Sequence, residues 1–304
     1  MENGYIDLHV HSNKSDGLDS VAKIINMALS NNVSVLALAE HYNISSYMLA
    51  KRIAGKAIEI IPAMELGTDM MKLGFTRRSR CHILVYYPEQ KEMYKILNEY
   101  EEARDKYVQK VVTELNLSGI KITLEKIKLY ARDKQSIGRY DVAQALNKLG
   151  IVSSIEEAYD KYLAYSNENS IEREKPTPIE LIKKISKIGG VPVLAHPNSL
   201  AITHAHTQVS KEQDKKFNDF IIQLVDAGLK GIEAQNSFAT PERVEYFKSI
   251  ARKYDLIATA GSDYHGRKND IICVGRGINN NMSVTDYTII EKLKAAATKS
   301  GIII

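Results

Sequence analysis

Residues 5–11, Tyr5-Ile6-Asp7-Leu8-His9-Val10-His11, form an apolar run that ends in a His-x-His pair. Alternate residues of a β-strand point to the same face of a sheet, so His9 and His11 can bind one ligand from the end of this strand. An amphipathic helical pattern follows at 20–31, with apolar residues three or four positions apart. A strand followed by such a helix is typical of a parallel sheet with helical crossovers. The start of the chain therefore predicts an α/β fold with polar side chains at strand ends.

The same alternation continues along much of the chain. Runs rich in β-branched residues predict strands at 34–39, 59–63, 82–86, 191–195, 231–234 and 257–260. Helical patterns accompany the later strands at 178–187, 215–227, 241–254 and 286–298. One α/β barrel can take about 200–250 residues. The 304 residues therefore predict one catalytic body with a modest insertion.

A long middle segment differs from the rest of the chain. Residues 90–170 show helical periodicity, and their strand signals are weak throughout. Pro176 and Pro178 then mark the return to the strand–helix alternation. We therefore predict a helical insertion subdomain at 90–170, within a catalytic barrel made of 1–89 and 171–304.

The composition is that of an ordinary globular protein, with 44% hydrophobic and 26% charged residues. The formal net charge of +4 permits an anionic ligand but does not require one. Two cysteines are too few for a disulfide framework and favour a reducing compartment. The sequence shows no signal-peptide pattern and no apolar run near the ~18 residues of a membrane span. We therefore expect a cytoplasmic protein with no membrane contact and no obligate protein partner.

Histidines and carboxylates recur where the predicted strands end or, for His82, begin. The nine residues with this placement are His9, His11, Asp16, His41, Glu65, His82, His196, Asp263 and His265. Each has an ordinary alternative, since a single strand-end histidine is more often a satisfied polar residue, and Glu65 or Asp263 could lie at a helix N-terminus. Together, however, they repeat one topological position in six segments, and a parallel barrel keeps its active site at that position. We therefore predict that the nine side chains form one polynuclear metal centre.

The ligand types indicate which ions such a centre would hold. Mixed imidazole and carboxylate ligands suit Zn, Mn or Fe rather than Mg or Ca. Cys81 would point to the opposite side of its strand from His82 and is expected in the core, whereas His204 and His206 are expected in a surface loop. Ions about 3.5–4 Å apart can activate water and clamp the oxygens of a phosphoryl group. We therefore expect two to three divalent ions and hydrolysis by a metal-activated hydroxide.

The order of these motifs resembles that of the PHP family (polymerase and histidinol phosphatase domains). The shared elements are His9-x-His11, Asp16-Gly17, His41, Glu65, His82, Ala195-His196-Pro197 and Gly261-Ser262-Asp263-x-His265-Gly266. The resemblance spans nearly the whole chain and implies a distorted (β/α)7 barrel with a three-metal site. It would place His9, His11, Glu65 and Asp263 on the first ion, Glu65, His82 and His196 on the second, and Asp16, His41 and His265 on the third.

Within the family, one branch is similar in its insertion as well. Members of this branch carry an Ile-Gly-Arg element in a helical insertion, and this chain has Ile137-Gly138-Arg139. The branch includes phosphatases of nucleotide 3′,5′-bisphosphates and 5′-to-3′ exoribonucleases that trim short RNA. The resemblance implies that Arg139 binds phosphate through its guanidinium fork, with Arg104 as a second candidate. The ordinary alternative for both is a solvated helix arginine.

Two positions depart from the family pattern. Glu40 stands where the family usually has the Asp of Thr-Asp-His, which keeps His41 but changes the support around the metals. Asp141 stands where the family usually has a His after the Ile-Gly-Arg element, and a carboxylate there would repel a phosphate. His196 and His265 could assist proton transfer, although the resemblance uses both as metal ligands.

We therefore expect a metal-dependent phosphoesterase that acts on a phosphorylated small molecule, either a nucleotide or a short oligoribonucleotide. The family's histidinol-phosphate phosphatase activity is one alternative, which the Ile-Gly-Arg insertion disfavours. A non-catalytic metal-binding module is a second, which the complete ligand set disfavours. A DNA exonuclease is a third, but the small net charge argues against extended contacts with a duplex.

Overall fold

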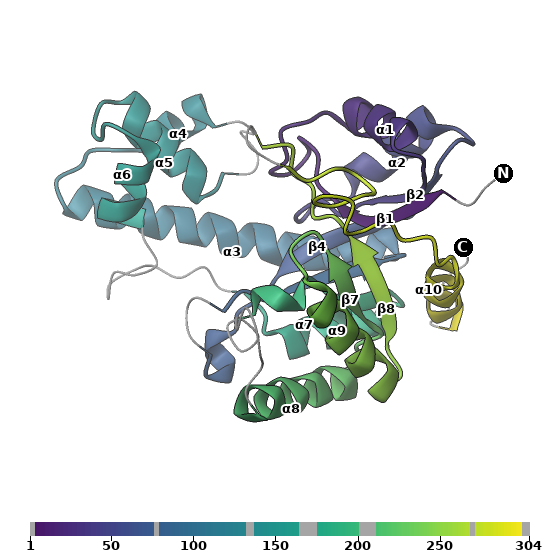
Figure 1. The fold of residues 1–304 in the computed structure, drawn as a ribbon. Coiled ribbons are helices and arrows are strands. Elements are labelled where there is room, and N and C mark those ends of the chain that lie inside the picture. The colour runs from purple at the N-terminus through teal and green to yellow at the C-terminus, as the bar shows by residue number, and fades with distance from the viewer. Residues whose placement is uncertain are drawn as a thin grey trace. The chain divides into compact units, whose positions relative to one another are not determined.

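The computed structural model describes residues 4–75, 79–131, 137–163, 175–200, 211–267 and 271–299 (Figure 1). The chain divides into two compact units. Met1–Tyr94 and Pro176–Ile304 form one, called the sheet unit here, and Lys95–Lys175 form the other, called the helical unit. Helix α3 (Gln90–Leu117) begins in the sheet unit and continues into the helical unit.

The N-terminal strands form a three-stranded parallel sheet. Its order is β1 (Tyr5–Val10), β2 (Val33–Leu38) and β3 (Glu59–Ile60). The crossovers are α1 (Val21–Ser30) and α2 (Ser45–Ala54). Ser20 caps α1, because its hydroxyl accepts the Lys23 backbone N–H at 3.3 Å. The apolar residues Ile24, Ile25 and Ala28 of α1 are buried in one hydrophobic cluster with side chains from all three strands of this sheet. This part of the fold agrees with the predicted strand–helix alternation.

The remaining strands form a five-stranded sheet. Its order is β4 (Ala63–Gly67), β5 (His82–Tyr86), β6 (Val191–Leu194), β7 (Gly231–Asn236) and β8 (Ile257–Gly261). The last three strands are parallel, and β7 and β8 lie side by side in Figure 1. Helices α7 (Pro178–Lys187), α8 (Lys211–Ala227) and α9 (Pro241–Lys253) each precede one of these strands, and α10 (Thr288–Lys299) follows the last.

The expectation of a wholly parallel sheet is wrong for β5, which runs antiparallel to both β4 and β6. In the described part of the β4–β5 connection, the helical element is the single 3-10 turn η1 (Met71–Leu73), whereas parallel pairing usually needs a helical crossover. The reversal places the start of β5 beside the ends of its neighbours. His82 pairs with Gly67, and Ile83 pairs with Leu194. His82 therefore reaches the same end of the sheet as residues that follow the parallel strands.

Backbone hydrogen bonds join the two sheets at this end. The Asp263 N–H donates to the His9 carbonyl at 2.8 Å, and the Glu65 N–H donates to the Glu40 carbonyl at 3.0 Å. The described strands nevertheless form two separate sheets. The mixed α/β class is therefore confirmed, whereas the closed (β/α)7 barrel is not.

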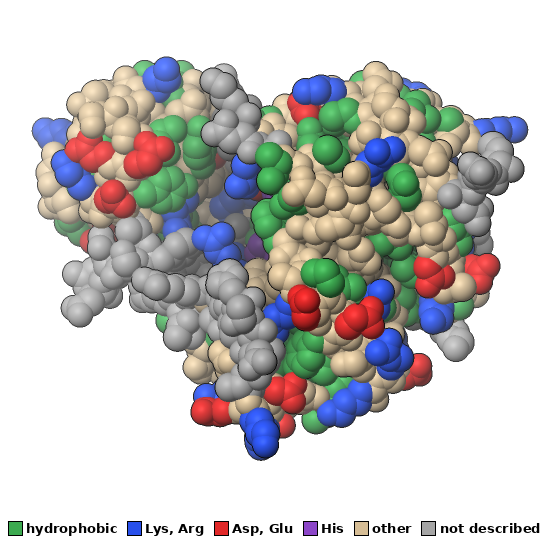
Figure 2. All heavy atoms as spheres, viewed as in Figure 1, with side chains coloured by type: hydrophobic (Ala, Val, Ile, Leu, Met, Phe, Trp, Pro, Cys, Tyr) green, Lys and Arg blue, Asp and Glu red, His purple; other side chains and the backbone are tan. Residues whose placement is uncertain are grey.

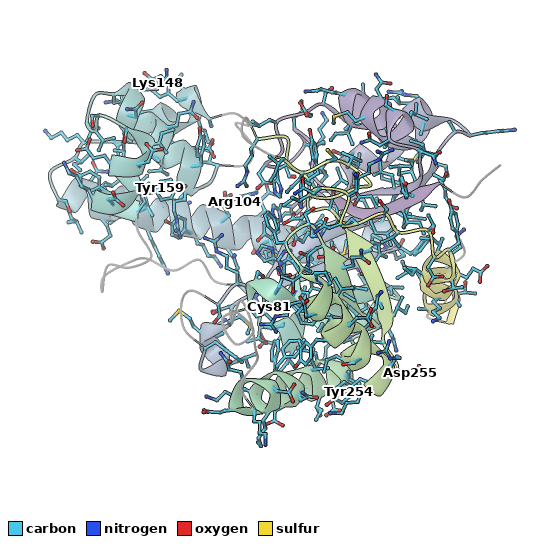
Figure 3. The ribbon with its side chains drawn as sticks, viewed as in Figure 1. Cys81, Arg104, Lys148, Tyr159, Tyr254 and Asp255 are labelled. Carbon is cyan, nitrogen blue, oxygen red and sulfur yellow. The ribbon has the colours of Figure 1, made fainter. Side chains whose placement is uncertain are left out.

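The helical unit has a core of its own. Besides the larger part of α3 it contains α4 (Leu124–Tyr130), α5 (Arg139–Lys148), α6 (Ile155–Ala158) and the π-helical turn η2 (Tyr159–Leu163). Figure 3 labels Arg104 on α3 and Tyr159 on η2. The buried side chains of this core include Val108, Ile127, Val142 and Leu146. None of the helices described, in either unit, is long and apolar enough to cross a membrane.

Candidate metal centre

Five imidazoles of the sheet unit form a closed circuit, and a sixth stacks on it. Neighbouring ring centroids are 5.0, 4.7, 5.4, 5.2 and 5.7 Å apart in the circuit His9, His11, His41, His82, His196 and back to His9. The sixth ring, His265, lies 4.3 Å from His11. These residues come from segments far apart in the sequence, so the folding of both sheets brings them together.

The Glu65 carboxylate lies among the rings of this circuit. Its Oε1 atom is 2.8 Å from Nε2 of His196 and 2.9 Å from Nδ1 of His82. Its Oε2 atom is 3.2 Å from Nδ1 of His41 and 3.4 Å from Nε2 of both His9 and His11. Glu65 is buried on β4, where pairing with β5 holds it opposite Leu84. One carboxylate therefore contacts all five rings of the circuit.

Two further carboxylates complete the cluster. Asp263 Oδ1 is 3.3 Å from Nε2 of His11, and Asp16 Oδ1 is 3.4 Å from Nε2 of His265. The nine residues singled out in the sequence thus lie together. Eight of them form overlapping groups of donors within 4.8 Å: His11, Asp16, His41 and His265; His9, His11 and Asp263; and His41, Glu65 and His82. The ninth, His196, joins the cluster through Glu65. His11 and His41 each belong to two of these groups, a sharing that the family resemblance did not imply.

The backbone at two of these residues is in an uncommon conformation. The φ angle is 55° at Asp263 and 24° at His196. Residues other than glycine rarely adopt a positive φ angle, and such residues are found preferentially at functional sites. Each residue lies two positions beyond the end of a strand, β6 for His196 and β8 for Asp263, and the turn in the backbone directs each side chain into the cluster.

The donor atoms fit a group of divalent ions. Around a tetrahedral ion bound at about 2.0–2.1 Å, the ligand atoms lie about 3.3–3.4 Å apart. The His9–Glu65, His11–Asp263 and His265–Asp16 donor atoms are 3.4, 3.3 and 3.4 Å apart. In addition, Asp16 Oδ1 and His41 Nδ1 are buried and make no hydrogen bond of good geometry, although His265 Nε2 and Glu65 Oε2 lie 3.4 and 3.2 Å from them as ionic neighbours. Buried polar atoms are normally paired, so these two atoms point to ligands that are not protein groups.

The protonation of the cluster follows from burial and from the carboxylates. Burial lowers the pKa of His41 to about 3, so this ring is neutral and has a lone pair for a cation. Burial alone would also lower the pKa of His11, but hydrogen bonds to Asp263 and Glu65 raise it to about 9. Burial alone would raise the pKa of Glu65, but the imidazoles of His82, His9 and His41 hold it well below its usual value. Glu65 is therefore ionised.

A family model described as the PHP domain matches residues 7–303. The chain belongs to the PHP family. A 5′-3′ exoribonuclease of Haemophilus influenzae is 27% identical over 263 residues, which cover 85% of this chain and 89% of that protein. A 3′,5′-nucleoside bisphosphate phosphatase of Chromobacterium violaceum is 24% identical over 262 residues, which cover 86% of this chain and 87% of that protein.

Among solved structures, a Bifidobacterium adolescentis protein described as a metal-dependent phosphoesterase has a TM-score of 0.67 at 21% identity, and the match covers 96% of each chain. This likeness supports the PHP fold. The family and the branch predicted from the motifs are therefore confirmed, and with them the expectation of a hydrolase that acts on ester bonds.

Glu233 of this PHP-family chain is a functional residue that the sequence motifs did not predict. This fully buried residue of β7 has Oε1 at 3.0 Å from Nδ1 of His9, and its Oε2 accepts the backbone N–H of His196 at 2.7 Å. Hydrogen bonds to the outer nitrogen of a metal-binding histidine fix its tautomer and orientation. A lone carboxylate in the apolar strand 231–234 was the available signal, because an unpaired charge is rarely buried.

Glu40, the first departure from the family pattern, lies beneath the loop that carries Asp16. Its fully buried carboxylate accepts the Ser12 N–H at 3.1 Å and the Ser15 hydroxyl at 2.5 Å, and it also accepts the Ser12 hydroxyl. Glu40 does not occupy a ligand position in the groups above. Glu40 directly precedes His41 in the chain and ties the loop at 12–16, which carries Asp16, to that segment. Two members of one donor group therefore share a support.

The predicted phosphate-binding arginines belong to the helical unit. Arg139 is the first residue of α5, and its Nε donates to the Tyr107 hydroxyl at 3.0 Å. Arg104 Nη2 lies 4.0 Å from Glu101. Asp141 accepts the Gly138 N–H at 2.8 Å and closes the first turn of α5, and its expected repulsion of a phosphate stays a prediction.

Cys81, His204 and His206 were predicted to lie outside the metal centre. Cys81 is buried, and burial raises the pKa of its thiol to about 12, so its expected place in the core is confirmed (Figure 3). His204 and His206 lie outside the described residues.

Proposed function

We propose that this PHP-family protein is a metal-dependent phosphoesterase that hydrolyses phosphate esters of nucleotides, either 3′,5′-bisphosphates or the 5′ ends of short RNA. The observation that carries the proposal is the position of Glu65, whose oxygens lie within 3.4 Å of five imidazoles. A buried carboxylate among nitrogen donors suits the bridging of neighbouring cations. The exoribonuclease and the bisphosphate phosphatase among its relatives support the substrate class.

We assign the ligands as the family resemblance implies. His9, His11, Glu65 and Asp263 would hold the first ion, Glu65, His82 and His196 the second, and Asp16, His41 and His265 the third. The mixed donor set favours Mn, Zn or Fe. When bound, the two to three ions would supply activation of water and neutralise charge on the phosphoryl oxygens.

His196 and His265 are better suited to ligand roles than to proton transfer. His196 Nδ1 is 2.8 Å from the Ser199 hydroxyl, and His265 Nδ1 is 2.8 Å from the Asp263 carbonyl. These contacts leave Nε2 of each ring directed at Glu65 or Asp16. A nitrogen that already faces a candidate ligand group is poorly placed to exchange a proton with the leaving oxygen.

We assign phosphate binding to Arg139, with Arg104 as the second candidate. The hydrogen bond from Arg139 Nε to Tyr107 orients the planar guanidinium, which also lies 5.4 Å from the Tyr107 ring centroid. A fixed guanidinium can bind two phosphate oxygens at once. Asp141 accepts the Gly138 N–H at the start of the same helix, so its carboxylate is held at the N-terminus of α5.

Extended binding of duplex DNA has less support. On the face seen in Figure 2, the Lys and Arg side chains of the described residues are interspersed with Asp and Glu. A protein that follows a duplex usually gathers Lys and Arg along its contact surface to meet several phosphates. Short RNA or a nucleotide requires fewer such contacts.

A phosphatase panel with added Mn²⁺ tests the proposal. Adenosine 3′,5′-bisphosphate and short RNA should be turned over, whereas histidinol phosphate should not. His41→Ala should abolish turnover, and Arg139→Ala should lower nucleotide turnover about ten-fold or more. Arg252→Ala, which removes an exposed arginine of α9, should leave turnover unchanged. Hydrolysis of histidinol phosphate alone, or loss of all ions on dialysis with no turnover, would reject the proposal.

A further inference from the structure

Arg267 is a cation beside the metal centre to which the sequence analysis assigned no role. Its Nη2 atom lies 3.9 Å from Asp16 Oδ2, and its side chain is 67% exposed. Asp16 directs its other oxygen, Oδ1, toward Nε2 of His265 and of His41, at 3.4 and 3.9 Å. Arg267 thus approaches the donor group from the side that faces away from the imidazoles.

The backbone places Arg267 at this position. The Leu18 N–H donates to the His265 carbonyl at 2.8 Å, and the Tyr264 hydroxyl donates to Asp19 at 2.6 Å. The chain then turns at Gly266, where φ is 67° and an added Cβ would lie 2.7 Å from Asp19 Oδ2. Glycine is therefore required for the turn that brings Arg267 next to Asp16.

The contact with Asp16 leaves the guanidinium able to bind an anion. A separation of 3.9 Å permits ionic attraction but is too long for a hydrogen bond. A guanidinium has five N–H donors in a planar fork, which suits two oxygens of one phosphate. Arg267 also borders a cavity of about 560 Å³ that Asp19, Lys23 and Asn26 help to line, and the Asp19 carboxylate is paired with Lys23 at 2.6 Å. This cavity gives space for a phosphate group beside Arg267.

We propose that Arg267 binds a phosphate group of the substrate other than the one that is hydrolysed. The inference rests on the proposed function and extends it to the sheet unit, since Arg139 and Arg104 belong to the helical unit. Bisphosphates and oligonucleotides carry a second phosphate, whereas simple phosphomonoesters do not. Arg267 therefore selects for substrates with two phosphates and does not take part in the hydrolysis.

The test compares Arg267→Ala with the wild-type protein on two substrates in the presence of Mn²⁺. For adenosine 3′,5′-bisphosphate, KM should rise about 10- to 100-fold, as expected for loss of a charged hydrogen bond. For p-nitrophenyl phosphate, which has one phosphate, kcat and KM should stay within about two-fold of the wild-type values. Arg267→Lys should recover part of the loss, and Arg252→Ala serves as the matched control for removal of an exposed arginine.

Two further measurements separate the possible failures. The Mn content per chain should be the same in Arg267→Ala and wild type, and equilibrium binding of the bisphosphate should weaken as KM rises. An equal loss on both substrates with lower Mn content would show that Arg267 acts through Asp16, which overturns the inference. An unchanged affinity for the bisphosphate would overturn it as well. A wild-type protein that binds the bisphosphate in an Arg267-dependent manner but does not hydrolyse it would reject the proposed function alone.

Discussion

The carboxylate of Glu233 lies 3.0 Å from Nδ1 of His9, and both side chains are fully buried. The contact assigns the ring proton to Nδ1 and directs Nε2 toward Glu65 and Asp263, at 3.4 and 3.6 Å. The other oxygen of Glu233 holds the backbone of His196. One buried carboxylate therefore orients two candidate ligands and is not itself a member of the donor groups.

Glu233→Gln should weaken metal binding without unfolding the protein. Glutamine preserves the volume but removes the charge that favours an Nδ1 proton on His9, and such changes typically cost about 10- to 100-fold in metal affinity or activity. Titration of the metal-free variant with Mn²⁺ measures the effect. Glu245→Gln is the control, since Glu245 is exposed on α9 and pairs with Lys248. A wild-type affinity in Glu233→Gln would contradict the assigned role.

Glu40→Gln should selectively reduce occupancy of the group that contains Asp16 and His41. A glutamine offers one acceptor oxygen where the carboxylate accepts bonds from Ser12 and Ser15 through both of its oxygens. We expect the Mn content to fall by about one ion per chain and activity to fall about 10- to 100-fold. Elemental analysis after dialysis measures the ions. Ser15→Ala should reproduce part of the effect, and full occupancy in both variants would refute this role of Glu40.

Metal uptake at pH 7 should release protons. In the metal-free protein, the hydrogen bonds to Asp263 and Glu65 overcome the effect of burial and raise the pKa of His11 to about 9, so this ring is protonated below that pH. An ion requires the neutral ring, so it must displace the proton. The apparent affinity for Mn²⁺ should therefore rise as pH increases from 7 to about 9. Calorimetry in two buffers of different ionisation enthalpy counts the protons, and a count of zero at pH 7 would contradict the prediction.

Asp7→Ala should destabilise the sheet unit. The fully buried carboxylate accepts the backbone N–H groups of Ser262 and Gly275 at 2.8 and 2.7 Å, and that of His9 at 3.3 Å. Unpaired buried donors cost about 1–3 kcal/mol each, so we expect the free energy of unfolding to fall by about 2–5 kcal/mol. Denaturant unfolding with a chelator present excludes metal binding from the comparison. A loss below about 1 kcal/mol would show that water replaces these bonds.

Much of the centre could be predicted because its residues follow local rules. His9 and His11 end an alternating apolar strand, and His196 and Asp263 each follow one, so periodicity alone marks their common position. Glu233 escaped notice because its role depends on a hydrogen bond to a residue 224 positions away. His82 was the apparent exception, because it begins a strand and does not follow one. It reaches the same end of the sheet because β5 is antiparallel to both neighbours, which periodicity does not reveal.

The sequence by itself determined most strand and helix segments and the residue types available to bind metal, because these depend on local periodicity and side-chain chemistry. Tertiary structure decided the direction of β5, the division into two sheets and the sharing of His11 and His41 between donor groups. It also decided which carboxylate lies among the five rings, as Glu65 does, and which carboxylates support the cluster from outside, as Glu233 does at Nδ1 of His9 and Glu40 does at Ser12 and Ser15. Hydrogen bonding and ion binding depend on distances of about 3 Å, and only the packing of distant segments sets those distances.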